Sequence, residues 1–254
     1  MEQPNREPDI ARAARLLASA SRARMLKALS DGRPLSASVL ATEAEVSLAT
    51  ASVHLGQLAE AGMVTVEHTG RHRYYRLTGP EIATALEALA VIAPAVATPV
   101  TSLRASSREN ALRRSRTCYD HVAGSLGVSL MDAFVSQELL TRHDRAEATR
   151  QASTDRPASY GKDLEYRLTA AGEQRFGAFG IDVDRLPTTR RPAVRYCVDW
   201  SEQRHHLAGA LGAALTERFF KLRWLRYGVA PRVVHLTDAG RQGMSETFGV
   251  DIAE

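Results

Sequence analysis

The chain has 254 residues, a formal net charge of +4 and an isoelectric point near 9.3. This length accommodates one or two hydrophobic cores, and no apolar run approaches the roughly 20 residues that cross a bilayer, which excludes a membrane-spanning protein. Two cysteines are too few for a disulfide scaffold, and residues 1–9 lack the apolar segment of a secretory signal, so we expect a cytoplasmic protein.

Positive charge favours an anionic partner, but its distribution along the chain matters more than its sum. Residues 1–100 are close to neutral despite the basic total. Any attraction to DNA in this region must therefore come from a few well-placed side chains and not from bulk charge.

The first part of the chain predicts three short helices. Residues 1–8 are expected to form a disordered tail, and apolar side chains then recur at helical spacing over residues 9–20. Ser21 is predicted to restart a second helix, which residues 31–32 (Asp-Gly) stop. Ser36 is the predicted N-cap of the third.

A longer helix and a β-hairpin follow. Ser47 is predicted to cap a fourth helix that ends at Gly62, the expected left-handed residue after a helix. Residues 63–66 and 73–77 alternate between apolar and polar around a turn, which indicates a hairpin. Pro80 suits the first turn of a fifth helix.

Helix, helix, short helix, helix, hairpin, helix is the order of a winged helix-turn-helix. Residues 9–94 resemble the ArsR/SmtB-type transcription regulators in three successive stretches, ASASRARMLKALSDG, VSLATASVHLGQLAEAGMV and TGRHRYYRLT. The resemblance implies that the fourth helix reads operator DNA in the major groove and that the first and fifth helices form a homodimer interface. A dimeric repressor is therefore expected.

The predicted DNA contacts lie at the start of the fourth helix and at the tip of the hairpin. Short side chains let a helix approach base edges closely, and hairpin arginines can enter a minor groove or clamp phosphates. The family often has Gln and Ser where this chain has Leu48 and Ala49, so we expect modest direct readout. The predicted DNA-binding residues are Ser47, Leu48, Ala49, Thr50, Ser52, Val53, His54, Gln57, Arg71 and Arg73.

The second half of the chain contains a duplication. Residues 116–140 return as residues 195–225 with six extra residues after the aspartate, and each copy later reaches a Leu-Thr-x-Ala-Gly phrase. Because a helix followed by strand, turn and strand is also the order of the N-terminal wing, we predict two tandem winged-helix-like repeats, residues 116–190 and 191–254. Residues 95–115 form the predicted linker helix region, and the predicted fold class is mainly α with small β-hairpin wings (α+β).

A role in packing or in ligand sensing is expected for the repeats in preference to DNA reading. Their predicted helices, residues 121–139 and 206–224, are apolar around much of their circumference. Arg116 and neighbouring arginines could still add phosphate contacts. The polar loop at residues 141–162 is predicted to be an extended, mobile wing.

Cysteine and histidine side chains in both copies suggest a metal site. Cys118 and His121 are three residues apart, which on a helix puts them on one face, and a thiolate with an imidazole suits zinc or a similar ion. If the copies pack about a pseudo-twofold axis, the two cysteines could converge in a Cys₂His₂-like or arsenic-type thiolate site. The candidate effector or metal residues are Cys118, Asp120, His121, Cys197, Asp199 and His206.

Other interpretations of the same residues stay open. The spacing is not a recognised zinc pattern, so the cysteines can equally be packing residues. An oxidisable thiol, or an organic ligand in an aromatic cavity near Tyr119, Trp200, Phe219 and Trp224, would also serve as an effector site. The third helix has no cysteine and the fifth no histidine, so the places where ArsR/SmtB-type metal sensors usually hold ligands are empty.

Three classes of function remain at this point. The favoured one is a sequence-specific DNA-binding repressor with an effector sensed in the C-terminal half, with no confident cofactor. An architectural DNA-binding protein without an effector is the alternative. An enzyme with a winged-helix appendage is disfavoured, because the sequence has no Gly-rich phosphate loop or nucleophile elbow.

Overall fold

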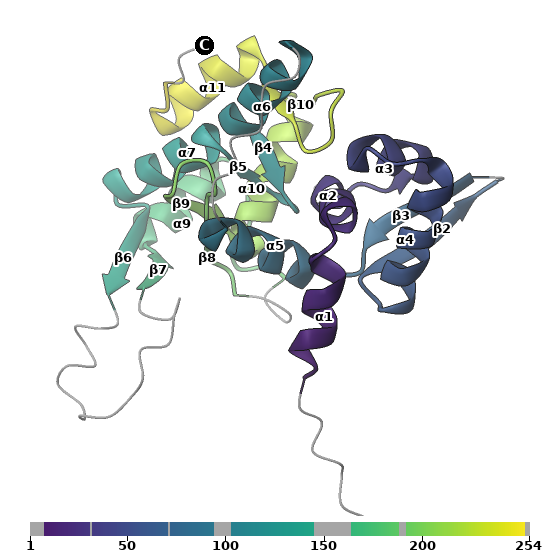
Figure 1. Cartoon of the computed structure of the whole chain (residues 1–254). Coiled ribbons are helices and arrows are strands. Elements are labelled where there is room, and N and C mark those ends of the chain that lie inside the picture. Colours follow the sequence, from purple (N-terminus) through teal and green to yellow (C-terminus); the bar gives the residue numbers. More distant parts are fainter. Residues whose placement is uncertain are drawn as a thin grey trace, which may run out of the picture. The chain divides into compact units, whose positions relative to one another are not determined.

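The computed structural model describes residues 8–30, 32–70, 72–93, 103–144, 164–187 and 192–251. The chain divides into two compact units, Met1–Leu86 and Glu87–Glu254 (Figure 1). Helix α5, Pro80–Ile92, contributes residues to both. The predicted tail, Arg71 and most of the predicted 141–162 wing lie outside the described residues. No described helix is long and apolar enough to cross a membrane.

The first unit is a winged helix-turn-helix, as predicted. Its elements are α1 (Ile10–Leu17), α2 (Ala20–Leu29), β1 (Leu35–Ser36), α3 (Ala37–Ala44), α4 (Leu48–Glu60), β2 (Val64–Thr69), β3 (His72–Leu77) and the beginning of α5. The three strands form one sheet in the order β1-β3-β2, with both pairs antiparallel.

Side-chain caps decide where the helices of this unit begin. The predicted caps are present: Ser36 accepts the N–H of Val39, and Ser47 accepts the N–H of Thr50. The predicted start of the second helix at Ser21 is wrong, because the cap is Ser19, whose side chain accepts from the backbone three residues later. Ser21 therefore lies inside α2.

The core of the first unit fixes the orientation of α4. Its buried side chains are Ala51, Leu55 and Leu58, which share one face of the helix. Gly62 follows the helix with a φ of +70°, the left-handed conformation predicted for it. The opposite face of α4 is consequently left toward solvent.

The second unit repeats one order of elements twice. After α6 (Leu103–Arg114), the order hairpin, helix, hairpin, helix occurs in each copy. The first copy comprises β4 (Arg116–Cys118), β5 (His121–Ala123), α7 (Ser125–Ser136), β6 (Leu140–Asp144), β7 (Leu164–Leu168) and α9 (Ala170–Ala178). The second comprises β8 (Arg195–Val198), β9 (His205–Ala208), α10 (Gly209–Lys221), β10 (Leu225–Tyr227), β11 (Val234–Leu236) and α11 (Asp238–Phe248).

Each copy opens with a hairpin that the sequence interpretation took for helix. The predicted helices at residues 121–139 and 206–224 are wrong at their starts, since β5 and β9 occupy the first few residues. Gly124 and Gly209, with φ of +78° and +83°, mark the change from strand to helix. A Cβ at Gly124 would lie 2.6 Å from the Arg113 carbonyl oxygen, so only glycine fits this junction.

The repeated Leu-Thr-x-Ala-Gly phrase joins a strand to the last helix of each copy. Thr169 and Thr237 cap α9 and α11 by accepting the N–H of Gly172 and Gly240. The same two hydroxyls donate to the carbonyls of Glu138 and Arg223, just before β6 and β10. Threonine therefore fixes the helix start to the hairpin in both copies.

The two copies share one hydrophobic core. Phe134 of α7 contacts Phe248 of α11 edge to face, with ring centroids 5.2 Å apart, and Phe176 of α9 lies at the same distance from Phe134. Leu130 and Leu215 occupy equivalent positions in α7 and α10 and are both buried. The copies thus bury their helices against each other.

Candidate functional site

The N-terminal half of α4 is the exposed face of the winged unit. Seven of the predicted DNA-binding residues are exposed in the structure, namely Ser47, Leu48, Ala49, Thr50, Ser52, Val53 and Gln57. Leu48 and Val53 are 54% and 61% exposed, high values for aliphatic side chains in a folded unit. The buried face of α4 holds this surface in place from behind.

An arginine outside the predicted set orders two of the polar residues of α4. The Arg22 Nη1 atom donates to Gln57 Oε1 at 2.9 Å and lies 3.5 Å from His54 Nδ1. His54 is half-buried as a result. Arg22 also donates to the carbonyls of Leu16 and Arg15. Sequence reasoning missed Arg22, because only the tertiary fold brings α2 beside α4.

The structure describes one of the two arginines that were predicted to contact DNA from the wing. Arg73 is exposed on β3 opposite His68 of β2. Arg76, three residues further along β3, lies 3.3 Å from Glu67, so Arg76 is committed to an ion pair. Among the described residues of the hairpin, Arg73 is therefore the arginine whose exposure suits contact with a phosphate. Arg71 lies outside the described residues.

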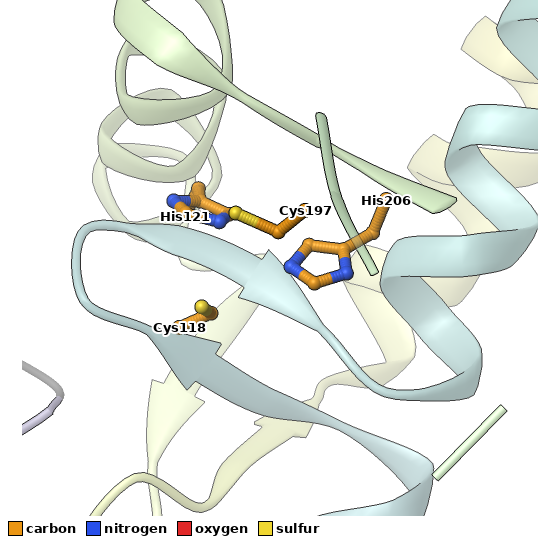
Figure 2. Close-up of side chains that lie close together, drawn as sticks. All are labelled: Cys118, His121, Cys197 and His206. Atoms are coloured by element: carbon orange, nitrogen blue, oxygen red, sulfur yellow. The ribbon is translucent and has the colours of Figure 1, made fainter. Parts of the chain in front are cut away.

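Four thiol and imidazole side chains gather in the second unit. Cys118 and His121 come from the first copy and Cys197 and His206 from the second, and their ligand atoms all lie within 4.8 Å of one another (Figure 2). Three of the four residues are buried, and Cys197 is half-buried. The predicted convergence of the two cysteines is therefore present in the structure, and we call these four residues the Cys₂His₂ cluster.

The cluster is built from strands and not from a helix. Cys118 lies directly opposite His121 across the β4–β5 hairpin, and Cys197 lies directly opposite His206 across the β8–β9 hairpin. The prediction that Cys118 and His121 share a helix face is therefore wrong, although both still point to one side, because directly paired residues of an antiparallel ladder do so. Each copy contributes the same cross-strand pair.

Two glycines let the hairpins approach each other symmetrically. A Cβ at Gly127 would lie 3.4 Å from the Cβ of His206, and a Cβ at Gly212 would lie 3.3 Å from that of His121. The imidazole rings of His121 and His206 are then 5.2 Å apart between centroids. This reciprocity is the packing expected for two copies about a pseudo-twofold axis.

The protonation states of the cluster follow from its burial. Burial opposes the charged form of His121, but Cys118 and Asp120 outweigh it and raise the pKa of His121 to about 9. For His206, burial and the neighbouring His121 lower the pKa well below its ordinary value. A hydrogen bond between the thiols raises the pKa of Cys118 and lowers that of Cys197. His206 is thus neutral, and Cys197 is the more acidic thiol.

The two predicted aspartates lie beside the histidines. Asp120 Oδ1 is 3.2 Å from His121 Nδ1, and Asp199 Oδ2 is 3.7 Å from His206 Nδ1. Asp199 is fully buried and is charged, because Arg116 and hydrogen bonds from Ser201 and Gly124 overcome the effect of burial and lower the pKa of Asp199 to about 2. Neither aspartate belongs to the cluster itself.

Arg116 is an interior residue of the second unit. It is fully buried, and its Nη2 atom donates to Asp199 Oδ2 at 2.9 Å. The same atom lies 3.9 Å from Glu87, which accepts from Arg232. The proposed phosphate contact of Arg116 is therefore wrong. Burial of a guanidinium needs a carboxylate partner, and Asp199 supplies it.

Three of the four aromatic residues of the suggested ligand cavity have contacts in two different places. Phe219 and Trp224 stack in the hydrophobic core with centroids 5.8 Å apart. Trp200 instead lies under the Arg116 guanidinium, whose Cζ atom is 4.7 Å from the centroid of the Trp200 ring. These aromatics therefore serve packing.

A family model and several solved structures are similar to the first part of the chain. A family model described as a helix-turn-helix domain matches residues 17–67. Similar solved structures include the homodimeric winged helix-turn-helix domain Mb0332 from Mycobacterium bovis, described as a possible ArsR-family regulator, which is 28% identical over 36% of this chain and 88% of its own, with a TM-score of 0.32. The repressor BigR from Xylella fastidiosa is 27% identical over 35% of this chain and 89% of its own, with a TM-score of 0.32.

A relative matches far more of the chain. YdfF from Bacillus subtilis (strain 168), named as an HTH-type transcriptional regulator, is 36% identical over 245 residues, which are 96% of this chain and 99% of YdfF. The match therefore extends over the second unit as well as the winged unit. The prediction of a winged helix-turn-helix regulator is confirmed, and the chain belongs to the family of HTH-type transcriptional regulators.

Proposed function

We propose that the chain is a dimeric repressor that binds operator DNA through α4 and the β2–β3 wing, and that an effector held in the second unit modulates this binding. The observation that carries the proposal is the exposed N-terminal half of α4. Its apolar side chains Leu48 and Val53 have no core to join, yet the buried face of the same helix positions them firmly. A surface of this kind suits the major groove, which admits one α-helix.

The readout combines methyl groups with hydroxyl acceptors. The hydroxyls of Ser47 and Thr50 bond each other at 2.9 Å, and Ser52 donates to the Leu48 carbonyl at 2.9 Å. Their hydroxyl protons are therefore partly committed, whereas their oxygens can still accept from base amino groups. Leu48, with Val53, offers methyl contacts that favour thymine. This combination supports weak but sequence-selective recognition.

Dimerisation through α1 and α5 would place two such helices on one operator. Ile10 of α1 is 77% exposed, and Leu89 and Ile92 of α5 are 43% and 70% exposed. Apolar side chains in this position are covered when two winged units pair, as the resemblance to ArsR/SmtB-type regulators implies. Two recognition helices then meet major grooves about 34 Å apart on a pseudo-palindrome.

The structure favours sensing over DNA reading for the second unit. Helix α10 buries seven of its 13 residues, so it presents no recognition face comparable to that of α4. Arg116 is withdrawn into the interior. An architectural protein that grips DNA with all its units needs such faces, and an enzyme would not be expected among relatives named as transcriptional regulators.

A matched pair of valine substitutions tests the DNA-binding part. Val53→Glu puts a carboxylate on the proposed DNA face, whereas Val229→Glu changes a still more exposed valine in the β10–β11 turn of the second unit. With a duplex selected from a random pool by the wild-type chain, we expect Val53→Glu to weaken binding at least about tenfold and Val229→Glu to leave it unchanged. Equal effects of both variants would contradict the proposal.

Sedimentation tests the dimer. Ile92→Asp introduces a charge on the exposed face of α5 and should shift the chain toward monomer, with Val229→Asp as the matched control. Operator binding should weaken in parallel, since a monomer loses the second half-site. A wild-type chain that sediments as a monomer at the concentrations that occupy the operator would exclude a dimeric repressor.

A further inference from the structure

The Cys₂His₂ cluster has the composition and the nearly closed geometry of a four-ligand metal site. In a tetrahedral zinc site, metal–ligand bonds of about 2.0–2.3 Å leave the ligand atoms roughly 3.3–3.8 Å apart. The four ligand atoms here already lie within 4.8 Å of one another. Small side-chain rotations would therefore close the cluster around an ion without a change of backbone.

The imidazoles of the cluster lack the hydrogen bonds that buried polar groups normally make. Nε2 of His121 and both ring nitrogens of His206 are buried without a hydrogen-bond partner. His121 is 6% exposed and His206 fully buried, so solvent does not supply the missing bonds. An ion bound to Nε2 of each ring would give two of these three atoms a partner.

A carboxylate lies beside Nδ1 of each ring, but only that of Asp120 is within hydrogen-bond distance. Asp120 lies beside Nδ1 of His121 and Asp199 beside Nδ1 of His206, at 3.2 and 3.7 Å. In metalloproteins, a ligating histidine commonly donates its second ring N–H to a carboxylate, which fixes the tautomer and leaves the other nitrogen for the metal. The first copy has this hydrogen bond, and the second places Asp199 at 3.7 Å from the corresponding nitrogen of His206.

We propose that the Cys₂His₂ cluster binds one zinc-class ion per chain, tetrahedrally, through Cys118, His121, Cys197 and His206, and that this ion is the effector. Thiolate and imidazole ligands select borderline and soft ions such as Zn²⁺ over Mg²⁺ or Ca²⁺. All four positions are filled by protein atoms, so the site has no place for a reacting substrate. Cys197 is the least buried of the four ligands.

The effector part rests on the proposed repressor function and on a buried chain of charges. Asp199, beside His206, accepts from Arg116, whose guanidinium also faces Glu87. Glu87 belongs to α5, the helix whose first residues complete the winged unit. Binding of an ion would bring positive charge beside His206, next to Asp199, and so change the electrostatic balance between Asp199, Arg116 and Glu87.

Cobalt substitution tests the site in the full chain without reference to DNA. Reduced protein freed of metal by a chelator is titrated with Co²⁺, whose thiolate charge-transfer and tetrahedral ligand-field absorption bands report Cys ligation. We expect saturation at one Co²⁺ per chain and displacement by Zn²⁺. Cys118→Ser, Cys197→Ser and His206→Gln should each weaken binding by more than about 100-fold, beyond the 10–100-fold typical of outer-shell changes.

The control is the neighbouring histidine. His205→Gln changes a half-buried residue that contacts Tyr166 and lies outside the cluster, so it should bind Co²⁺ as the wild type does. Circular dichroism of each metal-free variant establishes that it is folded, and Cys→Ser exchanges alter the interior least. A folded Cys118→Ser or Cys197→Ser variant that retains tight Co²⁺ binding overturns the site.

Operator affinity, measured with metal-free and Zn²⁺-loaded protein, separates the two proposals. A change of about tenfold or more that disappears in Cys197→Ser supports the ion as effector. Stoichiometric metal binding with unchanged operator affinity overturns the effector role. The metal site is overturned if reduced protein binds no Co²⁺, or if the cysteines are joined in a disulfide after preparation without oxidant. If neither the metal-free nor the Zn²⁺-loaded protein binds any selected duplex, the proposed repressor is contradicted and metal binding is left intact.

Discussion

Helices α4 and α10 have the same length, 13 residues each, yet they use it in opposite ways. Helix α4 buries only Ala51, Leu55 and Leu58, and most of the side chains in its first turns are exposed to solvent. Helix α10 is enclosed by the other copy of the duplication and by the aromatic core. A helix that packs on a small sheet by one face keeps its other face free for a large partner such as DNA. Duplicated units that pack on each other instead create an interior that can hold a small ligand such as an ion.

The largest expected effect breaks the buried charge network. Asp199→Asn leaves the Arg116 guanidinium buried beside a neutral amide, which should cost about 3–5 kcal/mol in the free energy of unfolding of the second unit. Both tryptophans, Trp200 and Trp224, lie in that unit, so denaturant unfolding followed by tryptophan fluorescence of metal-free protein measures it. The result shows how far the interior of this unit depends on its polar pairs.

The matched control is an exposed ion pair in the same unit. Asp132→Asn removes a carboxylate 2.6 Å from Arg204, but both side chains are at least half-exposed. Solvent screens such a pair, and we expect a loss below about 1 kcal/mol. Similar losses in the two variants would show that the Arg116–Asp199 pair is not the constraint described above.

Two glycine substitutions with opposite expected effects contrast α4 with α7, the counterpart of α10 in the first copy. A Cβ at Gly127 of α7 would lie 2.5 Å from the Val122 carbonyl oxygen, so Gly127→Ala should destabilise the second unit by about 1–3 kcal/mol. A Cβ at Gly56 on the exposed side of α4 meets nothing within 4 Å, so Gly56→Ala should stabilise α4 by about 0.5–1 kcal/mol.

The two glycine variants need separate measurements. Tryptophan fluorescence reports Gly127→Ala, and amide hydrogen exchange of α4 reports Gly56→Ala. A stabilising Gly127→Ala would mean that α7 is not held against the Val122 carbonyl as closely as this contact indicates.

A smaller effect concerns the aspartate beside His121. Asp120→Asn keeps the shape of the side chain but removes the charge 3.2 Å from His121 Nδ1, and should weaken Co²⁺ binding about tenfold through a less basic imidazole. The titration used for the cluster variants measures it. Unchanged affinity would exclude a supporting role for Asp120, although the four ligands could still bind the ion. Asp132→Asn again provides the control.

The smallest expected effect lies in the wing. Arg73→Ala should lower the slope of log affinity against log salt by about 0.9, the value for one phosphate contact, with a modest loss of affinity at low salt. Arg167→Ala, an exposed arginine on the strand β7 of the second unit, should change neither quantity. A salt slope that responds to Arg167 and not to Arg73 would reverse the roles of the two units in DNA binding.

Sequence patterns predicted the elements of the winged unit and the residue types of the cluster, but not how the cluster is assembled. Ser36, Ser47 and Gly62 act where the pattern placed them, because capping depends on residues three or four apart. The duplication likewise identified both cysteines. The spacing of Cys118 and His121 was ambiguous, since three residues fit one helix face or a tight hairpin equally well, and the structure has the hairpin.

By itself, the sequence determined the local elements of this protein and the pairing of residues between its two copies, since periodicity, caps and repeated phrases are short-range signals. The tertiary structure decided which of those residues meet. It brought Cys118 and His121 to Cys197 and His206, buried Arg116 against Asp199 and placed Arg22 beside Gln57. Such contacts join residues about 35 to 90 positions apart, and they follow from the packing of whole hairpins and helices, which no local pattern encodes.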